Sequence, residues 1–284
     1  MAPQGIIRIF MYNKEIKIKV MLKKSRKSRS SKKVTNNNVT FKVSTVKMND
    51  LSFDDKLFIP MQTKTRIDQF FSNDGGVMRG TVSAFTGDPG VGKTTVLLDI
   101  LADLQSQGQK CLFISGEMNA IDMVGYVKRF PKFGDVDILF MGDYAEVNPD
   151  VVLRATLKKG YDCVLMDSMS EVADMYTEFF GGTNKSNQGK LLQLLEEHNL
   201  GNNDSKINTA FLMIVQITKG GVFQGSNKLK HMVTSFGHMK MNEEGRYLHF
   251  SKNRRGGNAN KLFFSVSGGN KVNYLHEEAL NEVA

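Results

Sequence analysis

The segment with the clearest chemical meaning is GDPGVGKT at residues 87–94. It matches the phosphate-binding pattern G-x-x-x-x-G-K-[ST], in which glycines let backbone N–H groups curl around phosphate oxygens. An expected strand precedes it and an expected helix follows, and the amino end of a helix favours anions. In such a loop the lysine binds the β- and γ-phosphates of ATP, and the threonine hydroxyl ligates Mg²⁺. The residues predicted to bind the nucleotide are Gly87, Asp88, Pro89, Gly90, Val91, Gly92, Lys93, Thr94 and Thr95.

A site of this kind also needs a carboxylate in the Mg²⁺ shell. Asp167 follows the apolar run 163–166, which places it at the carboxyl end of a predicted strand, where ligands bind in open α/β sheets. Asp162 begins the same strand and is expected at the opposite edge. Thr94 and Asp167 are therefore the predicted metal ligands, and an ordinary loop acid is the alternative for Asp167.

Hydrolysis requires a group that orients and deprotonates the attacking water. Glu117 comes just after the run 111–115 and is expected on an adjacent strand end, although it also fits an acid at the start of a helix. Asp122 and Glu171 are weaker rivals. Gln216 follows the buried run 210–215 directly, so its amide could sense a γ-phosphate; a capping or surface glutamine is the alternative.

Strands and helices alternate around these residues, which predicts an α/β fold with a mainly parallel sheet and helices on both faces. The predicted strands are residues 80–85, 111–115, 136–141, 163–166, 210–215, 247–251 and 262–266, with a turn at 268–270. The predicted helices are residues 94–106, 120–129, 149–159 and 190–198.

The first 48 residues differ from the rest of the chain in composition. They hold 13 Lys and Arg against the single acid Glu15, and the remaining residues hold 25 basic and 28 acidic side chains. Alternation at residues 16–20 predicts one short strand, but KKSRKSRSSKK at 23–33 cannot build a core. We predict a basic, flexible extension over 1–48 and an ATPase domain over 49–284. A disordered leader, a binder of nucleic-acid phosphates and a targeting signal all fit the extension, and internal methionines leave its start codon open.

Composition excludes several other classes of protein. No apolar run approaches the 18 residues of a membrane-spanning helix, so a cytoplasmic protein is expected. The two cysteines, Cys111 and Cys163, lie in apolar runs and cannot build a disulfide framework or a cysteine zinc site.

The order of the motifs resembles that of a known family. GDPGVGKTT, LFISGE, VLMDS, VQITKGG, LKHMV and SKNRRGG together resemble the RadA/Sms DNA-repair ATPases, relatives of RecA, over about residues 62–270. Lys252, Asn253 and Arg254 match the start of the family's K-N-R-F-G signature, and Arg255 replaces its phenylalanine. Gln216 stands where RadA proteins usually carry histidine and RecA carries glutamine. The family's four-cysteine zinc element and its Lon-protease-like domain are not found in this sequence.

The resemblance implies a RecA-like core that uses ATP and Mg²⁺, assembles as a ring or filament, and acts on single-stranded or branched DNA. It implies that Lys252 and Arg254 present cations to the ATP of a neighbouring subunit. It also implies two DNA-binding channel loops, residues 175–189 and 217–230, each with an aromatic residue, Phe180 or Phe223, that could stack on a base. Flexible surface loops are the alternative.

Two other functions fit a similar set of motifs. One is the core of a DnaB-type replicative helicase, a family whose GEM-like and K-x-R-x-G motifs look similar to motifs of this chain. The segment LKHMV favours RadA over this alternative. The other is a KaiC-type regulatory module that binds ATP and a protein but no DNA. The lysines of the two expected channel loops and the basic extension argue against the second.

Overall fold

A computed structural model describes residues 7–11, 14–18, 45–216, 227–258, 260–266 and 271–275. Contacts between Cα atoms divide the chain into two units, Met1–Phe53 and Asp54–Ala284. In the first unit, β1 (Ile7–Met11) and β2 (Lys14–Ile18) form an antiparallel pair, so a second strand joins the one expected there. A short 3-10 helix, η1 (Met48–Asp50), follows. The boundary at residue 48 stays a prediction.

The second unit is built on a mixed sheet. Among its described residues, nine strands pair in the order β11-β10-β9-β8-β3-β7-β6-β4-β5. The parallel part contains β3 (Val82–Gly87), β4 (Cys111–Ser115), β5 (Asp137–Phe140), β6 (Cys163–Asp167), β7 (Ala210–Ile214) and β8 (Ser235–Asn242). Every residue of β3, β4, β6 and β7 is buried, which is why these strands read as unbroken apolar runs. The expected parallel α/β sheet is confirmed.

Antiparallel strands extend the sheet on one side. They are β9 (Gly245–Asn253), β10 (Leu262–Val266) and β11 (Val272–Tyr274). Of the β8–β9 pair, the sequence predicts β9 but not β8, because polar and apolar residues alternate irregularly in β8. The pair also contains a register shift between Phe236 and Gly237.

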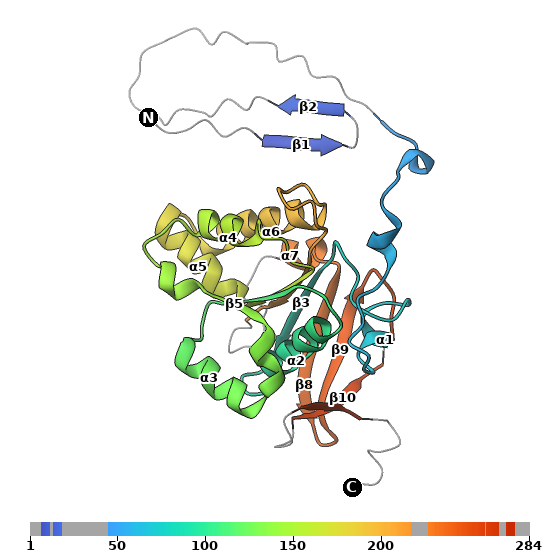
Figure 1. The fold of residues 1–284 in the computed structure, drawn as a ribbon, viewed down its shortest axis with the longest axis vertical. Helices are drawn as coiled ribbons and strands as arrows, with labels where there is room; N and C mark the ends of the chain where they lie inside the picture. Colours follow the sequence, from blue (N-terminus) through green and yellow to red (C-terminus); the bar gives the residue numbers. More distant parts are fainter. Residues whose placement is uncertain are drawn as a thin grey trace. The chain divides into compact units, whose positions relative to one another are not determined.

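Helices cover both faces of the sheet (Figure 1). The core on one face is closed by α1 (Asp68–Phe71), α2 (Lys93–Ser106), α3 (Ala120–Arg129) and the 3-10 helix η3 (Pro131–Asp135). The core on the other face is closed by α4 (Pro149–Leu157), α5 (Met169–Phe180), α6 (Asn184–Asn199) and α7 (Asn227–Met232). Two further 3-10 helices are η2 (Asp55–Phe58) and η4 (Met141–Tyr144). Within the described ranges, no helix is long and apolar enough to cross a membrane.

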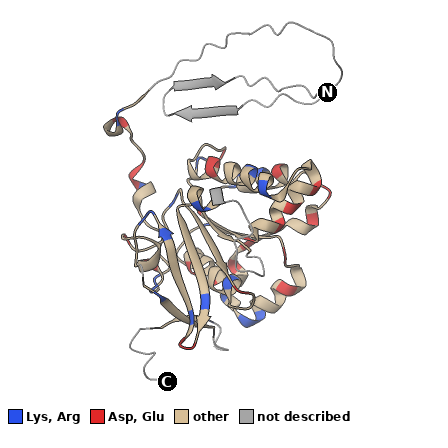
Figure 2. Cartoon of the chain, turned by 180° about the vertical axis from the view of Figure 1, so that it is seen from behind, with Lys and Arg blue, Asp and Glu red and all other residues tan. Residues whose placement is uncertain are grey.

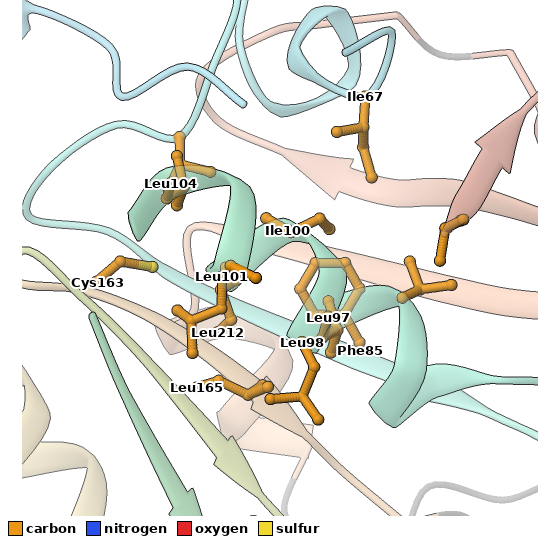
Figure 3. Close-up of a cluster of buried hydrophobic side chains, with 14 of the residues drawn as sticks. Ile67, Phe85, Leu97, Leu98, Ile100, Leu101, Leu104, Cys163, Leu165 and Leu212 are labelled. Atoms are coloured by element: carbon orange, nitrogen blue, oxygen red, sulfur yellow. The ribbon is translucent and has the colours of Figure 1, made fainter. Parts of the chain in front are cut away.

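Helix α2, which follows the glycine-rich turn after β3, is deeply buried. Leu97, Leu101 and Leu104 are fully buried, and the cluster they join includes Leu165 and Leu212 of the underlying strands (Figure 3). This burial fixes the helix on the sheet, and with it the position of its first residues. Helical stability in proteins comes mostly from such packing of an apolar face.

The two cysteines lie side by side in the sheet. Cys111 of β4 and Cys163 of β6 are partners in the parallel register, and both are free, buried thiols. Burial raises the pKa of Cys111 to about 12 and raises that of Cys163 as well.

The prediction of a loop at residues 175–189 is wrong. Helix α5 continues to Phe180, and α6 begins at Asn184, so a short turn containing Gly181 and Gly182 separates two helices. Thr183 caps α6 in a reciprocal capping box with Ser186. The glycine-rich composition therefore marks a helix junction. Of the second expected loop, residues 217–226 lie outside the described residues, as does the expected turn at 268–270.

The β8 residue Gly237 generates a test of this packing. A Cβ at this position would lie 2.7 Å from Cδ1 of Phe85, whose ring is fully buried and packs edge-on against Phe71 and Phe250. We expect Gly237→Ala to lower the free energy of unfolding by about 1–3 kcal/mol, because the ring has no room to move. Urea unfolding measures this. Gly142→Ala, whose Cβ would meet no atom within 4 Å, is the control. An equal effect of the two changes would contradict the packing argument.

Candidate nucleotide site

The glycine-rich turn between β3 and α2 is shaped to bind an anion. Gly90 and Gly92 have φ angles of 77° and 101°, in the left-handed region that glycine tolerates. Helix α2 begins at Lys93, and Gly92, its N-cap residue, has no side chain to occupy the first N–H groups. Those groups therefore remain available at the positive end of a buried helix, which is the arrangement that binds phosphate.

Lys93 folds back over this turn. Its Nζ donates to the carbonyl oxygens of Gly87, at 2.9 Å, and Asp88, at 3.0 Å. Burial lowers the pKa of Lys93, and the nearby carboxylates of Asp167, Glu117 and Asp88 act in the opposite direction. A partly desolvated ammonium group therefore lies across the mouth of the turn, where a phosphate would replace its carbonyl partners.

Thr94 of α2 and Asp167 of β6 come into direct contact, although β7 lies between β6 and β3, the strand that leads into α2. The Thr94 hydroxyl donates to Oδ2 of Asp167 at 2.5 Å. Asp167 is buried, and burial raises its pKa to about 6; Glu117 acts in the same direction, whereas Thr94 and Lys93 oppose the rise. A hydroxyl and a carboxylate are hard oxygen ligands, so this pair fits Mg²⁺. Asp162 lies at the opposite edge, where it forms an ion pair with Arg79 at 2.9 Å.

Glu117 and Gln216 also meet at this edge. Nε2 of Gln216 donates to Oε1 of Glu117 at 2.8 Å and to Oε1 of Glu171 at 3.2 Å. The strand β4 that precedes Glu117 pairs with β6, so Glu117 is adjacent to the strand of Asp167 and three positions from β3 in the sheet order.

The two rivals of Glu117 have different surroundings. Asp122 belongs to the capping box of α3, where its side chain accepts from the backbone N–H of Asn119. Glu171, in contrast, joins the site through Gln216. A local signal marks Glu171: it is three residues beyond Ser168, the N-cap of α5, so it lies in the first turn of a helix that begins at the site.

Lys252 and Arg254 lie away from these groups. Lys252 is in β9, and its Nζ donates to the carbonyl oxygens of Lys230, His231 and Val233. Arg254 follows the strand and donates to the carbonyl of His231 at 2.8 Å. Both cations therefore neutralise the carboxyl end of α7, and the structure does not bring them to the glycine-rich turn of the same chain.

Comparison with known proteins gives a consistent family. A family model described as the RecA N-terminal domain matches residues 62–233, more than half of the chain. DNA repair protein RadA of Streptococcus pneumoniae is 29% identical over 223 residues, covering 76% of this chain and 49% of that protein. DNA repair protein RadA of Campylobacter jejuni is 30% identical over 186 residues, covering 64% and 39%. The chain thus spans about half, or less, of the length of these relatives. The resemblance to RadA proteins is confirmed.

A solved structure supports the fold. A KaiC-like protein from the archaeon Pyrococcus horikoshii superposes with a TM-score of 0.53 at 18% identity, covering 72% of this chain and 93% of that one. At this identity the likeness establishes the fold alone.

The raised pKa of Asp167 predicts a cost in stability. Its pKa is about 6 in the folded chain, against 3.8 for a free carboxyl. Well below pH 3.8 the group is neutral in both states; well above pH 6 it is ionised in both, and only the folded state holds it desolvated. We therefore expect Asp167→Asn, without nucleotide, to raise the free energy of unfolding by about 1–3 kcal/mol at pH 8 and by little at pH 4.

Urea unfolding at the two pH values checks this expectation. Asp143→Asn, at an exposed carboxylate in η4, is the control and should change the free energy of unfolding by less than about 0.5 kcal/mol. A stabilisation by Asp167→Asn that is the same at both pH values would rule out the buried charge as its cause.

Proposed function

We propose an activity from one premise: the chain belongs to the RecA family, whose model matches more than half of it. The proposed activity is hydrolysis of ATP coupled to work on single-stranded or branched DNA, as a RadA-like branch-migration or strand-exchange motor. The observation that carries the ATPase part is the Thr94–Asp167 hydrogen bond, because it joins the glycine-rich turn to the one acid at the end of β6. Hydroxyl and carboxylate oxygens meet there as Mg²⁺ ligands should.

Each residue has a defined role in this proposal. The N–H groups of the turn and the Nζ of Lys93 bind the phosphates, and Thr94 and Asp167 hold Mg²⁺, which neutralises phosphate charge. Glu117 accepts the proton of the attacking water. The amide of Gln216 holds Glu117 in place and lies directly before residue 217, so a change at Glu117 can pass to the following segment.

DNA as the partner is supported by two observations. The RadA relatives are named as DNA repair proteins, and the helix junction after α5 exposes the rings of Phe179 and Phe180 beside Gly181. Nζ of Lys190 lies 5.1 Å from the centroid of the Phe180 ring. Aromatic rings with nearby cations are typical of surfaces that bind single strands. A DnaB-type helicase core and a KaiC-like regulatory module remain the alternatives.

ATP turnover with and without single-stranded DNA tests the proposal. We expect DNA to stimulate the wild type, and Lys93→Ala to keep at most a few per cent of turnover, because the ammonium group that lies across the turn belongs to Lys93. Glu117→Gln should still bind ATP and Mg²⁺ but hydrolyse ATP about 100-fold more slowly, as expected for loss of a general base. Glu146→Gln, at an exposed acid, is the control.

The outcomes separate the alternatives. ATP turnover that single-stranded DNA does not stimulate would favour the KaiC-like module. Unwinding of a forked duplex would favour the helicase. Substantial turnover by Lys93→Ala would remove the glycine-rich turn from the mechanism.

We further propose that Arg254, with Lys252, acts on the ATP of a neighbouring copy in a ring or filament. In β8, Met239 pairs beside Gly87, whereas Ser235 pairs with both Ser83 and the end of β9 at Asn253. Four residues of strand, about 13 Å, therefore separate the end of β9 from the glycine-rich turn along the sheet. Arg254 is therefore badly placed to reach a phosphate bound at the glycine-rich turn of its own chain. The ATP of a neighbouring chain remains as its target.

Mixing variants tests this role. Arg254→Ala and Lys93→Ala should each be inactive alone, because a cation aimed at the γ-phosphate is worth about 10³–10⁵ in rate. Mixed before assembly, they should regain part of the turnover, since an intact turn can then face an intact arginine. Arg255→Ala, at the exposed neighbour, is the matched control. No recovery in mixtures shown to co-assemble would contradict action between subunits, and full activity of Arg254→Ala alone would exclude the role.

A further inference from the structure

A row of aromatic rings lies on the face of the antiparallel strands that points away from α2. Met239 of β8 and Leu248 of β9 are register partners and belong to the buried cluster under α2. Because side chains alternate along a strand, the next pair, His238 and His249, points to the opposite face. Tyr247 lies on that face as well, and all three rings are partly exposed.

The rings contact one another across three strands. His238 and His249 stack with centroids 4.9 Å apart and planes 15° from parallel. Tyr247 continues the row, 5.9 Å from His249 on the same strand and 5.5 Å from the buried ring of Phe263 on β10. The result is a continuous aromatic surface on a sheet, anchored at one end by a buried ring.

Two lysines lie beside this surface. Nζ of Lys261 lies 4.8 Å from the centre of the Tyr247 ring, and the exposed Lys240 is the register partner of Tyr247. Burial lowers the pKa of both histidines, that of His238 to about 4, and lysines that include Lys240 lower it further. The two histidine rings are therefore uncharged at neutral pH. Figure 2 shows basic residues along these strands and acidic residues at the turn that joins β8 to β9.

We propose that His238, His249 and Tyr247, with Lys240 and Lys261, form a platform on which bases of single-stranded DNA stack. The inference rests on the proposed function, because it takes single-stranded DNA as the ligand. Neutral rings offer π-faces to bases of any sequence, and the lysines bind the phosphates between them. Sheet faces that carry aromatic side chains bind single strands in this way in other folds. A second copy of the chain packed through the same face is a poorer occupant, because it would bring the same lysines together.

The chain contains no tryptophan, which allows a direct test. Tyr247→Trp keeps an aromatic ring at the platform and makes it the sole indole of the full-length protein. We expect oligothymidine to quench its fluorescence, because a stacked base contacts the indole. Tyr144→Trp, at a tyrosine 41% exposed in η4, is the matched control and should not be quenched. Equal quenching of the two proteins, or none at Tyr247→Trp, would overturn the platform.

Affinity gives a second measurement. By fluorescence anisotropy with labelled oligothymidine, Tyr247→Ala should bind about tenfold more weakly than wild type, from the usual contribution of one stacked ring. Lys240→Ala should lower the slope of log affinity against log salt by about 0.7, as expected for one lost phosphate contact. Tyr144→Ala and Lys159→Ala are the controls, and circular dichroism confirms that each variant is folded.

The two proposals fail differently in this experiment. If wild type binds no oligothymidine, action on DNA is overturned, and the platform with it. If wild type binds and Tyr247→Ala binds equally well, the platform alone is overturned. A change in sedimentation of Tyr247→Ala without a change in its affinity for oligothymidine would assign the surface to self-association and likewise overturn the platform.

Discussion

The parallel hydrogen bonding of β3, β7, β6 and β4 places every group of the candidate nucleotide site at one edge of the sheet. Parallel strands end at the same edge, so Gly87, Asp167 and Gln216 arrive there from distant parts of the sequence. The strand β7 is the critical one, because it separates β3 from β6 and yet leaves Thr94 within hydrogen-bonding reach of Asp167. A slip of one residue in the pairing of β3 with β7, or of β7 with β6, would turn the side chains of the slipped strand to the other face and break this contact.

The same edge concentrates charge that the interior would otherwise exclude. Lys93 and Asp167 are both partly or wholly removed from water, and each stabilises the charged form of the other. Neither has an ideal partner: Lys93 donates to carbonyl oxygens, and Asp167 accepts from a neutral hydroxyl. Groups that are buried and imperfectly paired favour a ligand that supplies both charges, as Mg²⁺ and phosphate together would. Under the proposed function, the site would lose stability and gain affinity for its ligands, a common arrangement at functional positions.

Local patterns were sufficient for the parts of this structure that depend on neighbours in sequence. The glycine-rich turn, the helix after it and the buried strands each have a signal within a few residues, and the boundaries of Cys111–Ser115 and Ala120–Arg129 agree with the prediction. Contacts across the sheet left no such signal. The arrival of Glu171 beside Gln216, and the stacking of His238 on His249, depend on strand order and register. The loop over residues 175–189, which the family resemblance implied, is instead the end of α5 and the start of α6, because Thr183 caps a new helix there.

The paired positions of Cys111 and Cys163 have a consequence for handling the protein. Both sulfurs lie inside the sheet, and burial keeps both as thiols rather than thiolates, the form that reacts with alkylating reagents and oxidants. The two thiols are therefore expected to react only when the sheet opens. A cysteine introduced at the surface would carry the only readily labelled thiol of the folded chain, so a probe could be attached at one chosen position without first replacing the native pair.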